Sequence, residues 1–109
     1  LGSVADVVKA HSSRLAKDLV PPPNVEGEVT LQGKAATVVD IAFTSSPGVP
    51  TGSKVMDLVA ELRGDIVAGT FETVGTTQVG RLAVGVESTR LDAFIREMEN
   101  HHIYTEVRA

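Results

Sequence analysis

The chain has 109 residues and a formal net charge of −4, with 42% hydrophobic and 22% charged residues, a balance typical of one folded domain with a single core. Its ten Lys and Arg residues are scattered, which argues against a nucleic-acid groove, because such a groove needs clustered basic side chains. The chain has no cysteine, so disulfides, thiolate metal ligands and a thiol nucleophile are excluded. No apolar run approaches the roughly 20 residues that a membrane-spanning helix needs.

Residues 1–34 are predicted to be a linker helix, a proline-rich spacer and a short arm. The helix must end before the prolines at 21–23, because proline supplies no backbone donor and favours an extended path. Its apolar residues at helical spacing are Val4, Val7, Val8, Leu15 and Leu19, with Ser3 as the expected N-cap. Residues 25–33 are expected to form a short strand or arm limited by Gly27 and Gly33. The chain starts without an initiator methionine or a signal peptide, so we expect it to be a fragment of a longer protein.

Residues 35–109 carry the alternations and stripes of a second, main unit. A strand is predicted over 36–43, with Thr37, Val39, Ile41 and Phe43 on one face and Val38, Asp40 and Ala42 on the other. The stretch 44–52 has loop composition. A helix is predicted over 53–62 from the apolar stripe Val55, Leu58, Val59 and Leu62. Gly64 follows at the position of a C-capping glycine.

Two strands, a helix and a last strand are predicted over the rest of the chain. Strands are predicted over 65–74 and 79–86, separated by a turn at Gly75, and the second strand has Leu82, Val84 and Val86 on one face. Ser88 is the expected N-cap of a helix with Asp92 in its first turn and with Asn100 as its left-handed terminator. Its apolar stripe is Leu91, Phe94, Ile95 and Met98. The last strand is predicted over 102–107, with Ile103, Thr105 and Val107 facing inward.

This order of elements is β-α-β-β-α-β, the ferredoxin-like pattern of the α+β class. Right-handed crossovers then give a four-stranded antiparallel sheet with two helices on one face and the strand order 4-1-3-2. The second strand is apolar on both faces, through Ile66, Val67, Ala68 and Phe71. Something must cover the second face or the edge of the sheet, and a second copy of the chain is the expected partner.

The sequence lacks the usual signatures of catalysis and metal binding. No phosphate-binding loop or G-x-S-x-G elbow is present. His101 and His102 are adjacent, and adjacent side chains on a strand point to opposite faces, which disfavours a shared metal ion. The strand over 79–86 has none of the aromatic residues that a ferredoxin-like RNA binder needs. We therefore expect no catalytic residue and no metal site.

Several short motifs occur in a fixed order. Asp65-Ile66-Val67 stands at the head of the second predicted strand and is followed by Gly69, Phe71, Gly75 and the pair Val79-Gly80. The closing stretch LDAFIREMENHHIYTEV and the early stretch RLAKDLV add two more matches. Together, and chiefly over residues 58–107, they resemble the NIL domain, the C-terminal regulatory domain of the ATP-binding subunit of bacterial methionine ABC importers. The family name comes from an Asn-Ile-Leu where this chain has Asp65-Ile66-Val67.

The resemblance implies a ferredoxin-like regulatory domain, not an enzyme, that forms a homodimer and binds L-methionine near the dimer interface. It implies transinhibition, in which cytoplasmic methionine holds the ATPase subunits apart and stops import. The parent would work with membrane permease subunits and a substrate-binding lipoprotein, and its ATP and Mg would belong to the ATPase domain that this chain lacks. The implied location is cytoplasmic, peripheral to the inner face of the membrane, with no cofactor in this fragment, no nucleic acid and no insertion into the bilayer.

The family's ligand-binding Asn carries over to Asp65. A carboxylate accepts hydrogen bonds from a ligand ammonium, but it cannot donate as an amide does, and it repels the ligand's carboxylate. The apolar lining of such a site would come from Ile66, Val67, Phe71 and Met56, with Phe71 offering a sulfur–aromatic contact. A simpler interpretation fits the same residues: Asp65 is a solvated turn residue, and the other four are ordinary core residues.

Two alternatives stay open on sequence alone, and a third is disfavoured. The chain also fits an ACT-like sensor of another amino acid, or a dimerisation module that binds no ligand. An acylphosphatase-type enzyme would need an arginine in the loop 44–52, which has none.

Overall fold

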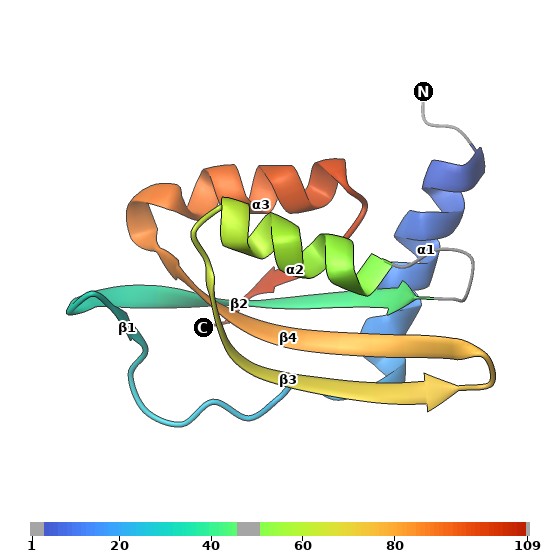
Figure 1. Cartoon of the computed structure of the whole chain (residues 1–109), viewed down its shortest axis with the longest axis horizontal. Coiled ribbons are helices and arrows are strands. Elements are labelled where there is room, and N and C mark those ends of the chain that lie inside the picture. The colour runs from blue at the N-terminus through green and yellow to red at the C-terminus, as the bar shows by residue number, and fades with distance from the viewer. Residues whose placement is uncertain (1–3, 46–50, 109) are drawn as a thin grey trace.

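An antiparallel sheet organises the part of the chain that the computed structural model describes, residues 4–45 and 51–108 (Figure 1). Its main strands are β2 (Lys34–Ser45), β3 (Asp65–Val74), β4 (Thr77–Glu87) and β5 (Tyr104–Val107), in the spatial order β5-β2-β4-β3. A two-residue strand, β1 (Thr30–Leu31), forms a hairpin with the start of β2. With α1 (Val4–Leu19), α2 (Thr51–Glu61) and α3 (Leu91–Asn100), the described residues form a small α+β domain.

The main core lies between the sheet and the pair α2 and α3, which run along the same side of the sheet (Figure 1). Alternate residues of β2 and β4 meet the apolar stripes of these helices, as the periodicity of the sequence predicts. The buried members are Val39, Ile41, Phe43, Val55, Val59, Leu82, Val84, Val86, Phe94, Met98 and Ile103. Two expectations fail at the ends of elements. Val107 is largely exposed, and a 3-10 turn, Ser88–Arg90, precedes α3 with no side-chain cap from Ser88.

Helices α2 and α3 end in the same way, and in neither case is the left-handed residue the one that was predicted. After α2 the left-handed residue is Arg63, with φ 59°, while the Gly64 N–H bonds back to the Val59 carbonyl at 2.9 Å. This six-to-one bond marks a Schellman motif. A Cβ on Gly64 would lie 2.7 Å from Val84 Cγ1, so the glycine is needed for close packing rather than for its φ angle.

The end of α3 repeats the motif with a histidine. The Ile103 N–H bonds to the Met98 carbonyl at 3.0 Å, and His102 takes the left-handed conformation with φ 57°. The prediction of Asn100 as the left-handed terminator is therefore wrong, because Asn100 is still the last helical residue. The motif turns the chain so that Ile103 enters the core before β5 begins.

The N-terminal segment (residues 4–29) covers part of the second face of the sheet: α1 contacts β2, β4 and β5 at one end, and the extended stretch that follows it runs below the strands in Figure 1. Ala16 and Val20 pack with Ala42 and Val79 in a small cluster of their own. Of the apolar residues at helical spacing in α1, Leu15 and Leu19 are exposed, and the predicted cap Ser3 lies outside the described residues. A second copy is not needed over the area that this segment covers. The edge of the sheet is therefore the place where a second copy of the chain is still expected to bind.

Candidate functional site at the edge of the sheet

Strand β3 is the outermost strand of the sheet and presents a long open edge. It pairs with β4 on one side, and no other described strand pairs with it on the other. Six of its ten residues form the uncharged run IVAGTF (66–71), and the strand holds no lysine, arginine or proline. These are the residues with which proteins usually block strand edges against pairing. The backbone N–H and C=O groups of this edge are therefore free to accept another strand.

A β-bulge near the start of β3 distributes its apolar side chains. Ile66 pairs with Val84 and Ala68 with Ala83, so Val67 is the extra residue. Val67 lies near Gly85 on the second face, where a Cβ on that glycine would be 3.6 Å from Val67 Cγ2. Ile66 lies on the helix side with its buried partner Val84. The bulge thus brings apolar groups to both faces at one end of the edge.

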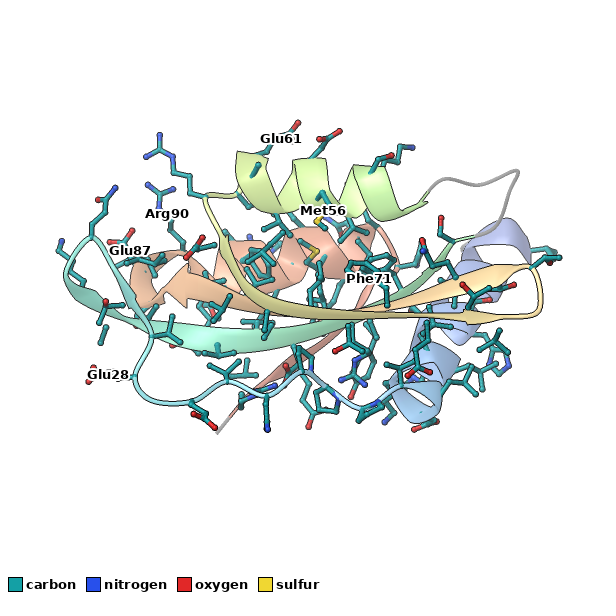
Figure 2. The ribbon with its side chains drawn as sticks, turned by 60° about the horizontal axis from the view of Figure 1, so that its bottom comes forward. Glu28, Met56, Glu61, Phe71, Glu87 and Arg90 are labelled. Atoms are coloured by element: carbon teal, nitrogen blue, oxygen red, sulfur yellow. The ribbon has the colours of Figure 1, made fainter. Side chains whose placement is uncertain are left out.

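Phe71 is held on the helix side by two glycines and another ring. It pairs with Gly80, and its ring packs edge-on against Phe43, with centroids 6.4 Å apart and an interplanar angle of 67°. A Cβ on Gly69 would lie 3.3 Å from the Phe71 ring, so the ring lies across that glycine. Figure 2 shows Phe71 on β3 and Met56 on α2 on this same side of the sheet. The contact between Phe43 and Phe71 was not predicted from the sequence, although Gly69 and Gly80 are the signal for aromatic rings that lie over a strand.

We call Met56, Ile66, Val67 and Phe71 the edge patch. Their exposed fractions are 37%, 38%, 38% and 47%, so the alternative that they form plain core does not describe them. Val74, at the other end of β3, is exposed as well and extends the apolar edge. Large apolar side chains that stay exposed along an unpaired strand are typical of an interaction surface.

Asp65 opens β3 directly after the turn that ends α2. Asp65 is exposed and pairs with Gly85, which directly follows Val84, the helix-side partner of Ile66. The structure therefore brings Met56, Ile66 and Phe71 to one side of the sheet, with Asp65 and Val67 beside the bulge. None of the five lines either of the two hollows found on the described surface. Within one copy of the chain they form a surface rather than a closed pocket.

The described residues contain no group of three or more His, Cys, Asp or Glu side chains placed to hold a metal ion. None of the described helices has the length and apolar character required to cross a membrane. Comparison with protein families found no family model that matches the chain, and comparison with curated proteins found no matching protein.

Proposed function

We propose that this chain is a ferredoxin-like regulatory domain of the NIL type, which forms a homodimer along β3 and senses L-methionine beside that seam. The observation that carries the proposal is the open ten-residue edge of β3 with its exposed apolar side chains. Two copies related by a two-fold axis would pair their β3 strands antiparallel and continue the sheet across the interface. Such pairing satisfies the open backbone groups and buries the edge patch of both copies.

The arrangement of the elements supports the ferredoxin-like assignment. Without the short β1, the strand order β5-β2-β4-β3 corresponds to 4-1-3-2 for four strands taken in chain order. Helices α2 and α3 join consecutive strands and share one core on one side of the sheet. Both features fit the β-α-β-β-α-β pattern that the sequence predicts.

A ligand site at the seam would combine the edge patch with Asp65. A carboxylate at the head of β3 offers charge-assisted hydrogen bonds to a ligand ammonium, while Phe71 and Met56 offer apolar and polarizable contacts to a thioether. Because these groups form an open surface in one copy, a partner copy would complete the walls of the site. Ligand binding would then favour one spacing of the attached domains over another.

The parent protein in this proposal is the ATP-binding subunit of a methionine importer at the cytoplasmic side of the membrane. The regulatory role is transinhibition, and this chain is not itself an enzyme. Its partners there would be the permease subunits and the substrate-binding lipoprotein.

Sedimentation equilibrium and titration calorimetry test the proposal together. We expect a dimer in the native chain, a monomer in Phe71→Lys, and an unchanged dimer in Leu19→Lys, which places the same charge on an exposed apolar position of α1. We expect heat with L-methionine that is lost in Asp65→Ala. Heat with a different amino acid in the same panel favours an ACT-like sensor, and a dimer that gives no heat favours a module without ligand. A native chain that stays monomeric contradicts the proposal.

A further inference from the structure

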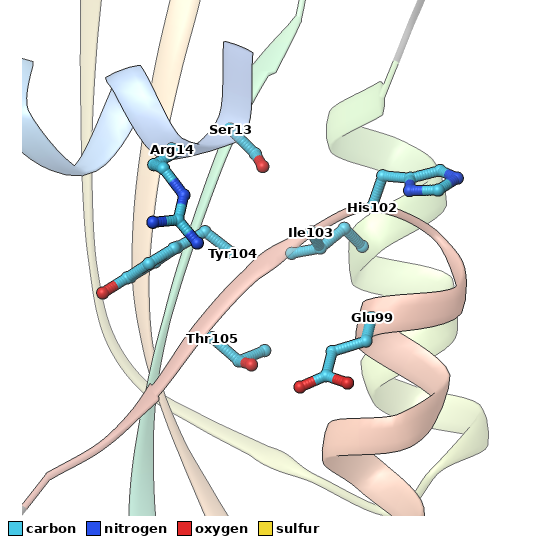
Figure 3. Close-up of a pocket in the computed structure, with 7 residues that line it drawn as sticks. All are labelled: Ser13, Arg14, Glu99, His102, Ile103, Tyr104 and Thr105. Carbon is cyan, nitrogen blue, oxygen red and sulfur yellow. The ribbon is translucent and has the colours of Figure 1, made fainter. Parts of the chain in front are cut away.

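A second candidate site lies at the opposite edge of the sheet from the edge patch. A cavity of about 260 Å³ opens where α1, the end of α3 and the start of β5 meet (Figure 3). Strand β5 is the far neighbour of β2, so the whole sheet separates this cavity from β3. The cavity is somewhat smaller than the roughly 300 Å³ at which pockets for drug-sized ligands begin. Its size therefore suits a small metabolite.

The walls of this cavity carry opposite charges. Arg14 lies on the α1 side, and Glu99 projects from the last turn of α3 on the other (Figure 3). The Arg14 guanidinium carbon lies 6.0 Å from the centre of the Tyr104 ring, and Lys17 Nζ lies 5.0 Å from the same centre, so the aromatic ring holds the positive side in place. The carboxyl end of α3 adds the negative end of a helix dipole to the Glu99 side.

The remaining lining contains both polar and apolar groups. Ser13, from the buried face of α1, and Thr105, from β5, bring hydroxyl groups to it. Ile103 is buried against the core and Tyr104 is half-buried, so both give the cavity an apolar floor. His102 also lines the hollow, so five of its seven lining residues are polar or charged. A hollow that combines apolar contacts with polar anchors of opposite sign is the form of a site for a small polar ligand.

This charge pattern selects the ligand class. A simple anion would be repelled by Glu99, and a simple cation would be repelled by Arg14, so one wall opposes each of them. A zwitterion satisfies both walls, with its carboxylate on the guanidinium and its ammonium on the carboxylate. We propose that a free α-amino acid binds in this cavity, its carboxylate paired with Arg14 and its ammonium with Glu99.

Such a ligand would join two parts of the domain. Arg14 belongs to the N-terminal segment, whereas Glu99 and Thr105 belong to α3 and β5. A bound amino acid therefore links α1 to α3 and to β5 of the sheet. The site involves none of the edge-patch residues and does not depend on the proposed dimer.

Titration calorimetry with glycine, L-alanine and L-leucine tests the site, with propionate and propylamine as probes that carry only one charge. We expect at least one amino acid to bind and neither single-charge probe to do so. Arg14→Gln and Glu99→Gln should each weaken binding by about tenfold or more, since each removes a charge-assisted hydrogen bond. Both residues are exposed, so both variants should fold, which circular dichroism verifies.

Two comparisons separate this site from the edge patch. Asp65→Ala and Arg96→Gln, the latter on α3, should change the affinity of the cavity ligand less than about twofold. Hydrogen exchange of the α1 amides should slow when the amino acid is added to the native chain. The proposal is overturned if no amino acid binds, or if Asp65→Ala abolishes binding while Arg14→Gln and Glu99→Gln leave it unchanged. The latter result would leave the edge-patch proposal standing.

Discussion

Arg108 holds Asp40 with two hydrogen bonds, from Nε to Oδ2 at 3.0 Å and from Nη2 to Oδ1 at 2.6 Å. The same Nη2 donates to the Pro23 carbonyl at 2.9 Å. Asp40 sits in the middle of β2 on the second face of the sheet and is only 7% exposed. One guanidinium therefore ties together the N-terminal segment, the central strand and the end of the chain.

Asp40→Asn should lower the free energy of unfolding by about 2 kcal/mol. Removing one partner of a buried ion pair costs roughly 3–5 kcal/mol, and the partial exposure of the Arg108 side chain, at 27%, lets water offset part of that cost. Urea unfolding provides the measurement. Glu87→Gln is the matched control, because the Glu87–Arg90 pair is exposed on both sides and should contribute less than about 1 kcal/mol. Equal losses in the two variants would show that the Asp40 pair has no special role.

Arg81→Met should loosen α1 more than it destabilises the whole domain. Arg81, 4% exposed, donates from Nη1 to the Lys17 carbonyl at 2.9 Å and to the Val20 carbonyl at 2.8 Å. The substitution leaves the two carbonyl acceptors without these hydrogen bonds, which costs roughly 1–3 kcal/mol of stability for each. Methionine also removes a desolvated charge whose Nε has no hydrogen-bond partner among the described residues, and this relief opposes the loss.

The global loss in Arg81→Met should therefore be about 1–2 kcal/mol, while the amides of α1 exchange much faster. Hydrogen exchange read by mass spectrometry measures both effects. Arg90→Met makes the same replacement at an exposed site and should leave α1 unchanged. Native protection of α1 in Arg81→Met would contradict the anchoring role of this arginine.

The sequence predicted the main sheet and its two core helices well because their signals are local. The strand over 65–74 has the predicted bounds, and the stripe Val55, Leu58, Val59 and Leu62 faces the core. The period of apolar residues depends only on near neighbours, so it survives without knowledge of the rest of the fold.

The docking of α1 was not predicted, for a physical reason. Its anchor, Arg81, reads as a polar position on a strand, and its acceptor on Val20 is 61 residues away. The helix contacts the sheet through the small Ala16, while its larger Leu15 and Leu19 are exposed. Long-range pairings of this kind leave no periodic trace in the sequence. The cavity at Arg14 and Glu99 was missed likewise, since its walls come from opposite ends of the chain.

The candidate site residues were predicted as a set, but their exposure was not. Apolar residues such as Ile66 and Phe71 indicate burial, and only the strand order shows that β3 lies at an edge. Edge and central strands share the same composition when a partner covers the edge.

The turn after α2 should respond in opposite directions to two neighbouring substitutions. Arg63 is in the left-handed conformation, which is costly for a residue with a Cβ. Arg63→Gly removes that cost and should stabilise the domain by about 1 kcal/mol. Gly64→Ala places a Cβ 2.7 Å from Val84 Cγ1 and should destabilise it by about 1–3 kcal/mol. Thermal and urea unfolding of both variants measure these two changes in stability. Stabilisation by Gly64→Ala would mean that the packing around this turn is looser than the structure shows.

The aromatic pair beside the edge patch should depend on Gly80. A Cβ on Gly80 would overlap the ring of Phe43, which itself packs against Phe71. Gly80→Ala should therefore cost about 1–3 kcal/mol of unfolding free energy through overpacking. Gly85→Ala is the control on the same strand, since its new Cβ would lie 3.0 Å from Val29 Cγ1 and no closer than 3.6 Å to Val67 and the Asp65 carbonyl.

A double-mutant cycle isolates this ring contact. Phe43→Leu alone should lose stability, but in the Gly80→Ala background it should lose less, because the smaller side chain makes room for the new methyl group. We expect a favourable coupling of about 1 kcal/mol, within the range for residues in direct contact. Additive losses would show that Phe43 can move away from Gly80 at no cost. In that case Phe71 would not be fixed by its aromatic neighbour, and the helix side of the edge patch would be free to rearrange.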